Sequence, residues 1–396
     1  MKKILIIEDD RVVASIYRNK FLGAGYKVEV AVDGEEGLAV VKNFRPDLVQ
    51  LDLMMPKING VEVLKKLRAD PEWKSLPVVV LSNSYLMHMV EEAWRAGATR
   101  CIAKSDCSPR QMVEIVGTLL AEEAPAPPPP TSPAPTGGTA FFRAPTVPAV
   151  ASSGEADAAF QMELRKSFLE SGPQTIGVLR TLLQNVLKGE GDTARLASIS
   201  ELFRKVRSVA SNAAVVEYAP IARLSSGLEA LLKELYDKPQ NISASSLRTV
   251  AQTVDLLEAL YKTGQNYQAA VSSTPGVLVV DDDLIARRAI VYALEKVGIK
   301  CITLEDPVAA LNMMAENRFD LIFLDVDMPG MDGFELCRKI RAQPSHEKTP
   351  VVFVTALTDF ESRAKSALSG GNDLIAKPFL FMELAVKALL YLLRPR

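Results

Sequence analysis

Residues 48–60 read LVQLDLMMPKING, and residues 321–333 read LIFLDVDMPGMDG. Each stretch is a short apolar run that ends in an aspartate, Asp52 or Asp325, and then continues into proline and glycine. Short apolar runs bounded by turn residues are typical of buried strands. The two stretches begin 273 residues apart, so the chain carries one pattern twice.

The same offset relates four further positions around each aspartate. The first set is Glu8, Asp9, Asp52, Ser82 and Lys104, and the second is Asp281, Asp282, Asp325, Thr355 and Lys377. In both sets the second acid precedes the strand aspartate by 43 residues, the hydroxyl follows it by 30, and the lysine follows the hydroxyl by 22. Scattered surface acids would not keep these spacings, so the repeat indicates a functional site present in two copies.

The composition excludes several classes of protein. A chain of 396 residues is too long for one core. A net charge of −2 gives no basic field for nucleic acid. No apolar run approaches the ~20 residues that cross a bilayer. The opening MKKILIIEDD ends its apolar stretch in three acids, which predicts a first strand and not a signal peptide.

The four cysteines, Cys101, Cys107, Cys301 and Cys337, form no CxxC pair and no small disulfide framework. Reduced thiols in the cytoplasm are the expectation from this pattern.

Both ends of the chain, 1–122 and 275–396, alternate apolar strand runs with amphipathic helical stretches. This alternation predicts a five-stranded parallel sheet with helices on both faces. The repeated polar positions follow the first, third, fourth and fifth strand runs. Since open α/β sheets place their sites at the carboxyl ends of strands, each set should converge at one edge.

The segment between the two α/β regions differs from them. Residues 123–154, with APAPPPPTSPAPTGG, predict a disordered spacer that leans toward polyproline II, and a proline-recognition ligand is the alternative. Residues 155–272 predict a bundle of four or five helices, with breakers at 189–191 and 239–241. Such a bundle can be a rigid spacer or a dimerising element.

Two carboxylates after the first strand and one after the third repel each other unless a cation lies among them. Oxygen ligands with open positions suit Mg²⁺, which also bridges to phosphate. A carboxylate such as Asp325 can then act as a nucleophile toward phosphorus, while Lys377 neutralises the transferring group. The sequence therefore indicates magnesium-dependent phosphoryl chemistry.

Both end regions resemble receiver domains of two-component response regulators. The motifs are IIEDD, LDLMMPKING, VVLSN and AKSD in the first region, and VVDDD, LDVDMPGMDG, FVTA and AKPF in the second. The resemblance implies a flavodoxin-like, CheY-like fold that takes a phosphoryl group from a histidine kinase or phosphotransfer protein.

The resemblance also implies a role for each residue of the repeated set. Asp52 and Asp325 would be the phospho-acceptors, Ser82 and Thr355 would move toward the phosphoryl group, and Lys104 and Lys377 would bind it. Mg²⁺ would be held by Glu8, Asp9, Asp52 and the Met54 carbonyl in the first copy, and by Asp281, Asp282, Asp325 and the Asp327 carbonyl in the second.

The first copy departs further from the family pattern. Asn59 stands where the second copy has Asp332, Ser105 where it has Pro378, and Asn83 where it has Ala356. The family's aromatic switch position holds Cys101 in one copy and Leu374 in the other. All five charged or hydroxyl positions are nevertheless present in both copies, so we expect both to be chemically competent.

The middle region resembles a histidine phosphotransfer (HPt) domain, through SFLESGPQTIGVLRTLLQNVL, LFRKVRSVASNAA and IARLSSGLEALLKEL. Aligning LFR with the family motif puts Arg207 at the histidine, Ala210 at the lysine and Ser211 at the glycine. A guanidinium stays protonated and cannot accept the phosphoryl group. We therefore expect a degenerate domain that does not relay phosphate.

Two interpretations concern individual polar residues. The only histidines, His88 and His346, are expected to be solvated surface residues. Arg204, Arg207 and Ser211 fall on one helix face by their spacing. That face is either simply solvated or a docking surface for the acidic edge of a receiver.

These observations predict a response regulator that is not itself an enzyme and signals through protein–protein interaction, without a DNA-binding output. The expected output surfaces lie near 85–101 and 360–374. Expected partners are a sensor kinase or phosphotransfer protein and a downstream protein, with a possible homodimer and no nucleic acid or membrane. The alternatives are a non-switching scaffold or phosphate sink, and, more remotely, an aspartate-nucleophile phosphatase.

Overall fold

The computed structural model describes most of the chain. It covers residues 1–82, 87–104, 107–121, 154–189, 191–264, 276–356 and 369–394, without the side chains of residues 87–88 and 154–161. The proline-rich spacer predicted over 123–154 lies almost wholly outside the described residues, as do Asn83 and Ser105. No helix in the described ranges is long and apolar enough to cross a membrane.

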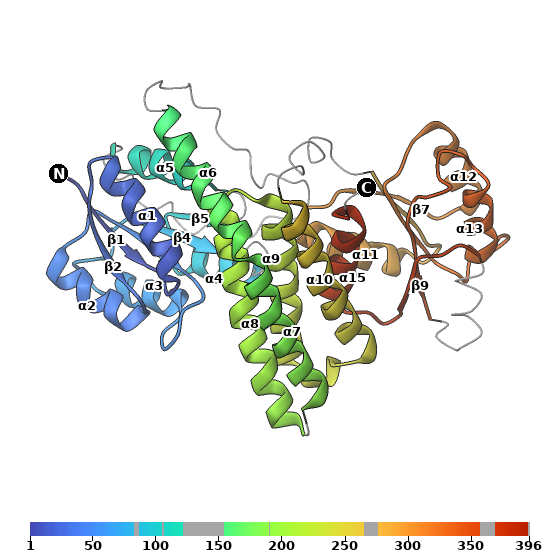
Figure 1. Cartoon of the computed structure of the whole chain (residues 1–396), viewed down its shortest axis with the longest axis horizontal. Helices are drawn as coiled ribbons and strands as arrows, with labels where there is room; N and C mark the ends of the chain where they lie inside the picture. Colours follow the sequence, from blue (N-terminus) through green and yellow to red (C-terminus); the bar gives the residue numbers. More distant parts are fainter. Residues whose placement is uncertain are drawn as a thin grey trace. The chain divides into compact units, whose positions relative to one another are not determined.

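The first α/β domain contains a five-stranded sheet in the order β2-β1-β3-β4-β5, in which β1 pairs in parallel with β2 and β3 (Figure 1). Its strands are β1 (Lys3–Ile7), β2 (Lys27–Ala31), β3 (Leu48–Asp52), β4 (Val78–Ser82) and β5 (Arg100–Ala103). Its helices are α1 (Arg11–Gly23), α2 (Gly34–Phe44), α3 (Gly60–Ala69), α4 (Met87–Arg95) and α5 (Pro109–Ala121). Helix α1 packs with α5, and α2 packs with α3.

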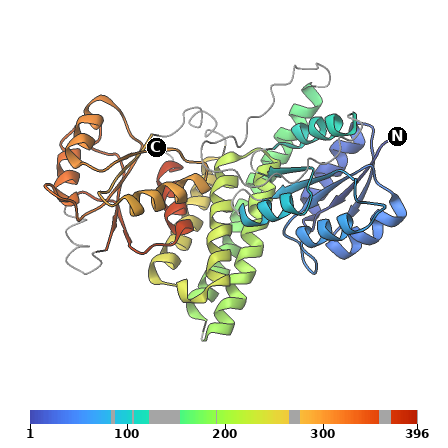
Figure 2. The same cartoon turned by 180° about the vertical axis from the view of Figure 1, so that it is seen from behind.

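The second α/β domain repeats this topology, with the order β7-β6-β8-β9-β10. It is drawn in orange and red in Figure 2. Its strands are β6 (Val277–Val280), β7 (Cys301–Leu304), β8 (Leu321–Leu324), β9 (Val351–Thr355) and β10 (Asp373–Ala376). Its described helices are α11 (Leu284–Lys296), α12 (Pro307–Glu316), α13 (Gly333–Arg341) and α15 (Phe381–Leu392). The prediction of two doubly wound, flavodoxin-like sheets is confirmed.

The central strands of both sheets are buried along their whole length. Every residue of β3, β4, β8 and β9 is buried. Strands covered by helices on both faces read as continuous apolar runs, which is why the sequence located them so closely. Gln50 is the exception in β3, because it is polar yet 1% exposed, and its amide has no hydrogen-bond partner among the residues that the structure describes.

The middle of the chain is helical. It contains α6 (Gly154–Glu170), α7 (Gly172–Lys188), α8 (Asp192–Val215), α9 (Ala219–Asp237), a short 3-10 turn at Pro239–Asn241 and α10 (Ala244–Thr263). The helix breaks fall at the glycine and proline positions that the sequence indicated. Residues Phe168–Arg396, which include α7 to α15, lie within one compact unit.

Candidate functional site

The repeated polar residues lie at the carboxyl ends of the strands. Asp52 and Ser82 are the last residues of β3 and β4, and Lys104 directly follows β5. In the second domain Asp281 and Asp325 directly follow β6 and β8, Thr355 ends β9, and Lys377 follows β10. Ser82, Lys104 and Thr355 are all buried, so each set lies in the packed part of its domain, at the carboxyl edge of the sheet.

Three carboxylates converge in each α/β domain. In the first, Glu8, Asp9 and Asp52 each offer an oxygen, and these atoms lie within 4.8 Å of one another. In the second, Asp281, Asp282 and Asp325 do the same. Both clusters contain only oxygen donors and lie at the sheet edge where ligands bind, so the residues fit a hard divalent cation such as Mg²⁺.

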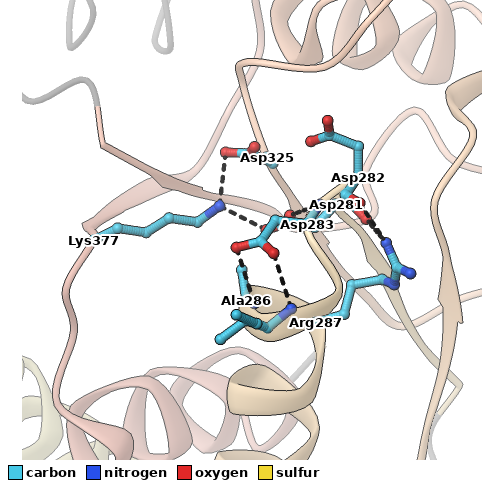
Figure 3. A network of polar contacts seen from close by, with 8 residues as sticks. Asp281, Asp282, Asp283, Ala286, Arg287, Asp325 and Lys377 are labelled. Carbon is cyan, nitrogen blue, oxygen red and sulfur yellow. Dashed lines mark hydrogen bonds and ion pairs between the residues drawn. The ribbon is translucent and has the colours of Figure 1, made fainter.

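Lys377 connects the acids of the second domain, as Figure 3 shows. Its Nζ lies 2.7 Å from Asp281 Oδ2 and 3.2 Å from Asp325 Oδ1. Asp281 is fully buried and Asp325 is 6% exposed. The ammonium thus supplies positive charge between two carboxylates that would otherwise repel each other. A phosphoryl group on Asp325 would be within its reach.

Burial and charge shift the pKa values at this site. Burial raises the pKa of Asp325, and the negative charge of Asp281 raises it further, although Lys377 opposes both effects. Burial alone would lower the pKa of Lys377, but its hydrogen bond to Asp281 and the charge of Asp325 raise it above the ordinary value. Lys377 therefore stays an ammonium.

Arg287 holds the loop that carries the metal-ligand candidates, and the sequence interpretation missed it. Its Nη1 donates to the carbonyls of Asp281 at 2.6 Å and Asp282 at 2.9 Å (Figure 3). Its Nη2 lies 3.1 Å from Glu305 Oε2. The equivalent position in the first domain is Ala14. This difference between the two copies, which lies outside the acidic motif, is the sequence signal that could have identified Arg287.

Capping residues fix where the helices beside the sites begin. Asp10, Asp33 and Asn59 cap α1, α2 and α3, and Asp283, Asp306 and Asp332 cap α11, α12 and α13 in the same way. Asn59 and Asp332 both accept a hydrogen bond from the backbone N–H three residues later. The difference between the copies at this position therefore leaves the helix start unchanged.

A glycine follows Asn59 and Asp332 because the chain there passes against the backbone of the acceptor aspartate. A Cβ at Gly60 would stand 2.2 Å from the carbonyl oxygen of Asp52, and one at Gly333 would stand 2.0 Å from that of Asp325. No side chain fits at either position without displacing the acceptor's backbone.

Lys57 distinguishes the first domain. It occupies a left-handed conformation, φ 66°, where the second domain has Gly330 at φ 79°. Its Nζ lies 2.6 Å from Asp33 Oδ2, and this contact lowers the pKa of Asp33. The interaction with the α2 cap offsets part of the strain that a lysine experiences at positive φ.

His346 is buried, so the prediction of a solvated residue is wrong. Its side chain is fully buried, its Nε2 accepts from the Phe319 N–H at 3.2 Å, and its Nδ1 lies 2.9 Å from Ser345 Oγ. The polar sequence around it gave no sign that Phe319 and Arg341 enclose it. The side chain of His88 lies outside the described residues.

An arginine stabilises the same corner in both domains. Arg68 Nε donates to the carbonyl of Gly97 and Arg341 Nε to that of Gly370, each at 2.9 Å. Nη1 of Arg341 also binds the His346 carbonyl at 3.1 Å, and Nη1 of Arg68 binds the equivalent Trp73 carbonyl at 3.3 Å.

In the helical region, the face predicted for α8 is only partly formed. Arg204 is exposed and Arg207 is half-buried, whereas Ala210 and Ser211 are 1% and 2% exposed. The prediction that Ser211 shares an accessible face with the arginines is wrong, because α8 packs between α7 and α9.

The comparisons with known proteins concern the two α/β domains. The family model described as "Response regulator receiver domain" matches residues 4–117 and 277–388. Protein PilG of Pseudomonas aeruginosa is 34% identical over 114 residues, which are 28% of this chain and 84% of PilG. Protein RcaC of Microchaete diplosiphon is 36% identical over 120 residues, which are 30% of this chain.

The chain covers only 18% of RcaC and less than half of several other relatives. Among solved structures, the chemotaxis response regulator CheY4 of Vibrio cholerae is 32% identical. That alignment covers 30% of this chain and 99% of CheY4, with a TM-score of 0.29.

Proposed function

Since this chain belongs to the response regulator receiver domain family, we propose that both α/β domains accept a phosphoryl group, on Asp52 in the first and on Asp325 in the second. The family places the chain in two-component signalling and implies a histidine kinase as partner. The observation that carries the proposal is the convergence of Asp281, Asp325 and the Lys377 ammonium at one sheet edge.

The reaction at each acceptor is a displacement at phosphorus. A carboxylate oxygen of Asp52 or Asp325 forms a P–O bond, and the P–N bond of the donor phosphohistidine breaks. The imidazole nitrogen keeps the electron pair and takes up a proton. Water later hydrolyses the acyl phosphate to inorganic phosphate, which returns the carboxylate.

The other residues of the site would bind the metal ion or the phosphoryl oxygens. Glu8, Asp9 and the Met54 carbonyl in the first domain, and Asp281, Asp282 and the Asp327 carbonyl in the second, would hold Mg²⁺ together with the acceptor. A bound Mg²⁺ would neutralise charge on the phosphoryl group. Lys104 and Lys377 would bind phosphoryl oxygens, and Ser82 and Thr355 would donate a hydroxyl hydrogen bond to them.

This proposal is tested by mapping the modified residues. The full chain is incubated with acetyl phosphate and Mg²⁺, the acyl phosphate is reduced with borohydride, and peptides are analysed by mass spectrometry. We expect homoserine at positions 52 and 325, and none after chelation of the metal. Labelling at other aspartates, or labelling that persists with excess chelator, would contradict the assignment.

The output would be protein–protein interaction without a catalytic output, in the cytoplasm. The surfaces expected near 85–101 and 360–374 lie partly outside the described residues. A scaffold or phosphate sink is the alternative, and a lifetime of the phosphoryl group that no partner changes would favour it. An aspartate-nucleophile phosphatase is less well supported, because such enzymes carry the nucleophile after the first strand, whereas Asp325 follows β8, the third strand of its domain.

The helical region would act as a degenerate HPt-like domain that does not relay phosphate, since residues 155–272 contain no histidine. The exposed Arg204 and half-buried Arg207 would instead contribute to docking an acidic receiver edge. Arg207→Glu should weaken binding of the separately expressed helical region to such a partner, with Lys188→Glu on α7 as the control. Equal binding of both variants and the wild type would remove this role.

A further inference from the structure

Helix α15 of the second domain is buried on all sides, unlike its counterpart in the first domain. Nine of its residues are buried, from Met382 to Leu390, whereas α5 buries only Pro109, Met112 and Val116. A helix that is buried all round must have a second packing partner beside its own sheet. That partner is the helical region, because α9 and α10 both pack against α15.

The packing between α9 and α15 is close. A Cβ at Gly227 of α9 would stand 3.1 Å from Leu389 Cδ1 and 3.4 Å from Val386 Cγ2 of α15. The absent side chain at Gly227 lets the two helices approach, and the apolar side chains of α15 fill the space. This arrangement requires that α15 keep its position to within a few tenths of an ångström.

Polar groups of the helical region also complete the ends of helices in the second α/β domain. Leu380, the N-cap residue of α15, makes no side-chain capping hydrogen bond, and the carboxylate of Glu234 on α9 lies near the Met382 N–H of the first turn instead. Arg223 of α9 donates to the carbonyl of Val297, the C-cap of α11, at 3.2 Å. An acid at a helix N-terminus and a base at a C-terminus both complement the helix dipole.

A buried carboxylate fixes the first turn of α15 against α10. Glu383 is 5% exposed, and its Oε1 accepts from Ser245 Oγ at 2.5 Å and from Thr249 Oγ1 at 3.4 Å. A hydrogen-bonded buried carboxylate is sensitive to geometry, since losing its donors leaves a buried charge without partners. A small movement of the first turn of α15 would therefore disturb α10.

A short segment joins the same turn to Lys377, the ion-pair partner of the phospho-acceptor Asp325. Only Pro378 and Phe379 separate Lys377 from Leu380, where α15 is about to begin. Lys377 shares its ammonium between Asp281 and Asp325. A phosphoryl group adds negative charge at Asp325 and draws the ammonium away from Asp281.

From these contacts we propose that α9 and α10 are the effector of the second receiver, and that phosphorylation of Asp325 loosens their contact with α15 through residues 377–380. The proposal rests on the function proposed above, namely that Asp325 accepts phosphate. The sign follows from the structure, because the contact is complete while Asp325 is unmodified.

The coupling must act in both directions, since a ligand that weakens a contact binds better when the contact is already weak. Fluoroberyllate with Mg²⁺ provides an equilibrium mimic of the phosphoryl group. In an Asp52→Ala background, only the second site binds it. Glu234→Gln and Ser245→Ala should each raise its affinity by about three- to tenfold. Glu201→Gln and Ser198→Ala, which make the same changes on α8, should leave it unchanged.

The direct test is hydrogen exchange of the Asp52→Ala chain before and after acetyl phosphate with Mg²⁺, with intact mass confirming one added phosphoryl group. We expect faster exchange in 219–237, 244–263 and 381–392 on phosphorylation, and no change when Asp325→Ala is added.

Phosphorylation without faster exchange in these helices would overturn the effector role and leave the phospho-acceptor assignment intact. Unchanged or reduced fluoroberyllate affinity in Glu234→Gln and Ser245→Ala would also overturn it. A chain that acquires no phosphoryl group and binds no fluoroberyllate would refute both proposals.

Discussion

Single residues set the geometry of the two acceptor sites, and glycine does so most directly. Gly60 and Gly333 lie against the backbone of Asp52 and Asp325, each beside a capping residue that starts the next helix. The acceptor's position thus depends on the absence of a side chain as much as on the charged groups around it.

Gly333→Ala should lower the free energy of unfolding of the second domain by about 2–3 kcal/mol, because the new Cβ overlaps the Asp325 carbonyl. It should also abolish phosphorylation of Asp325. Gly177→Ala in α7 is the control, since a Cβ there would meet no atom of the described residues within 4 Å beyond its own helix backbone and chain neighbours. That change should be neutral or stabilise by about 0.5–1 kcal/mol. Urea denaturation gives both values, and equal effects would contradict the packing argument.

Arg287→Ala should weaken Mg²⁺ binding at the second site about tenfold, because the loop carrying Asp281 and Asp282 loses two hydrogen bonds. Loss of the positive charge would act in the opposite direction, but Glu305 already pairs with that charge. Arg287→Lys separates the two effects, since lysine keeps the charge and lacks the guanidinium fork.

The measurement is calorimetric titration of Mg²⁺ in an Asp9→Asn background that disables the first site. Both Arg287 variants should show the loss, and Arg288→Ala, an exposed neighbour, should not. Normal affinity in Arg287→Lys would show that charge, and not position, is what this residue contributes.

His346 makes the second domain sensitive to acid. Burial, with a smaller effect from Arg318, lowers its pKa in the folded protein below the ordinary 6.5, so folding favours the neutral ring. The contribution to stability is complete above pH 6.5 and is lost as the pH falls below that value.

His346→Gln should therefore flatten the decrease in thermal midpoint of the second domain between pH 7.5 and 5.5, measured by calorimetry. His88→Gln removes the chain's other histidine and should keep the wild-type slope. A slope unchanged by His346→Gln would show that other groups cause the dependence.

At the scale of the elements, strands were predictable and contacts between helices were not. The central strands are mostly apolar because helices cover both faces, so the sequence located β3 to the residue. The burial of His346, the approach of Glu234 to the first turn of α15 and the contact of Arg341 with Gly370 depend on residues far apart in the chain. The hydrophobic periodicity of a single element does not predict contacts between residues so far apart in the sequence.

An ion pair of α15 illustrates this limit. Lys387 is 1% exposed and its Nζ lies 2.5 Å from Asp373 Oδ2 of β10. Lys387→Met should destabilise the second domain by about 3 kcal/mol, because Asp373 loses its partner in a largely buried position. The double variant Lys387→Met, Asp373→Leu should recover most of that loss.

The pair Arg110 and Glu114 on α5 provides the comparison, because both side chains are more than half exposed. Arg110→Met should cost less than about 1 kcal/mol. A double-mutant cycle measured by urea denaturation compares the two pairs. Equal coupling energies for both would contradict the assigned burial.

At the scale of the whole molecule, the sequence repeat was the observation that predicted most about the two α/β domains and their acidic sites. The alternation of strand and helix runs predicted both sheets, and the spacing of the ten polar positions predicted both acidic clusters, because one topology fixes which strand ends meet. The function of the helical region could not be read in this way. Its degenerate motif identifies no chemistry, and its contacts with α15 appear only in three dimensions.

The central claim is that one chain contains two working phospho-acceptors. Its most direct test is intact mass spectrometry after incubation with acetyl phosphate and Mg²⁺, on the wild type, Asp52→Ala and Asp325→Ala. We predict two added phosphoryl groups on the wild type and one on each variant. A single group on the wild type that Asp52→Ala retains would contradict the claim for the first domain, and no group on any of the three chains would contradict it altogether.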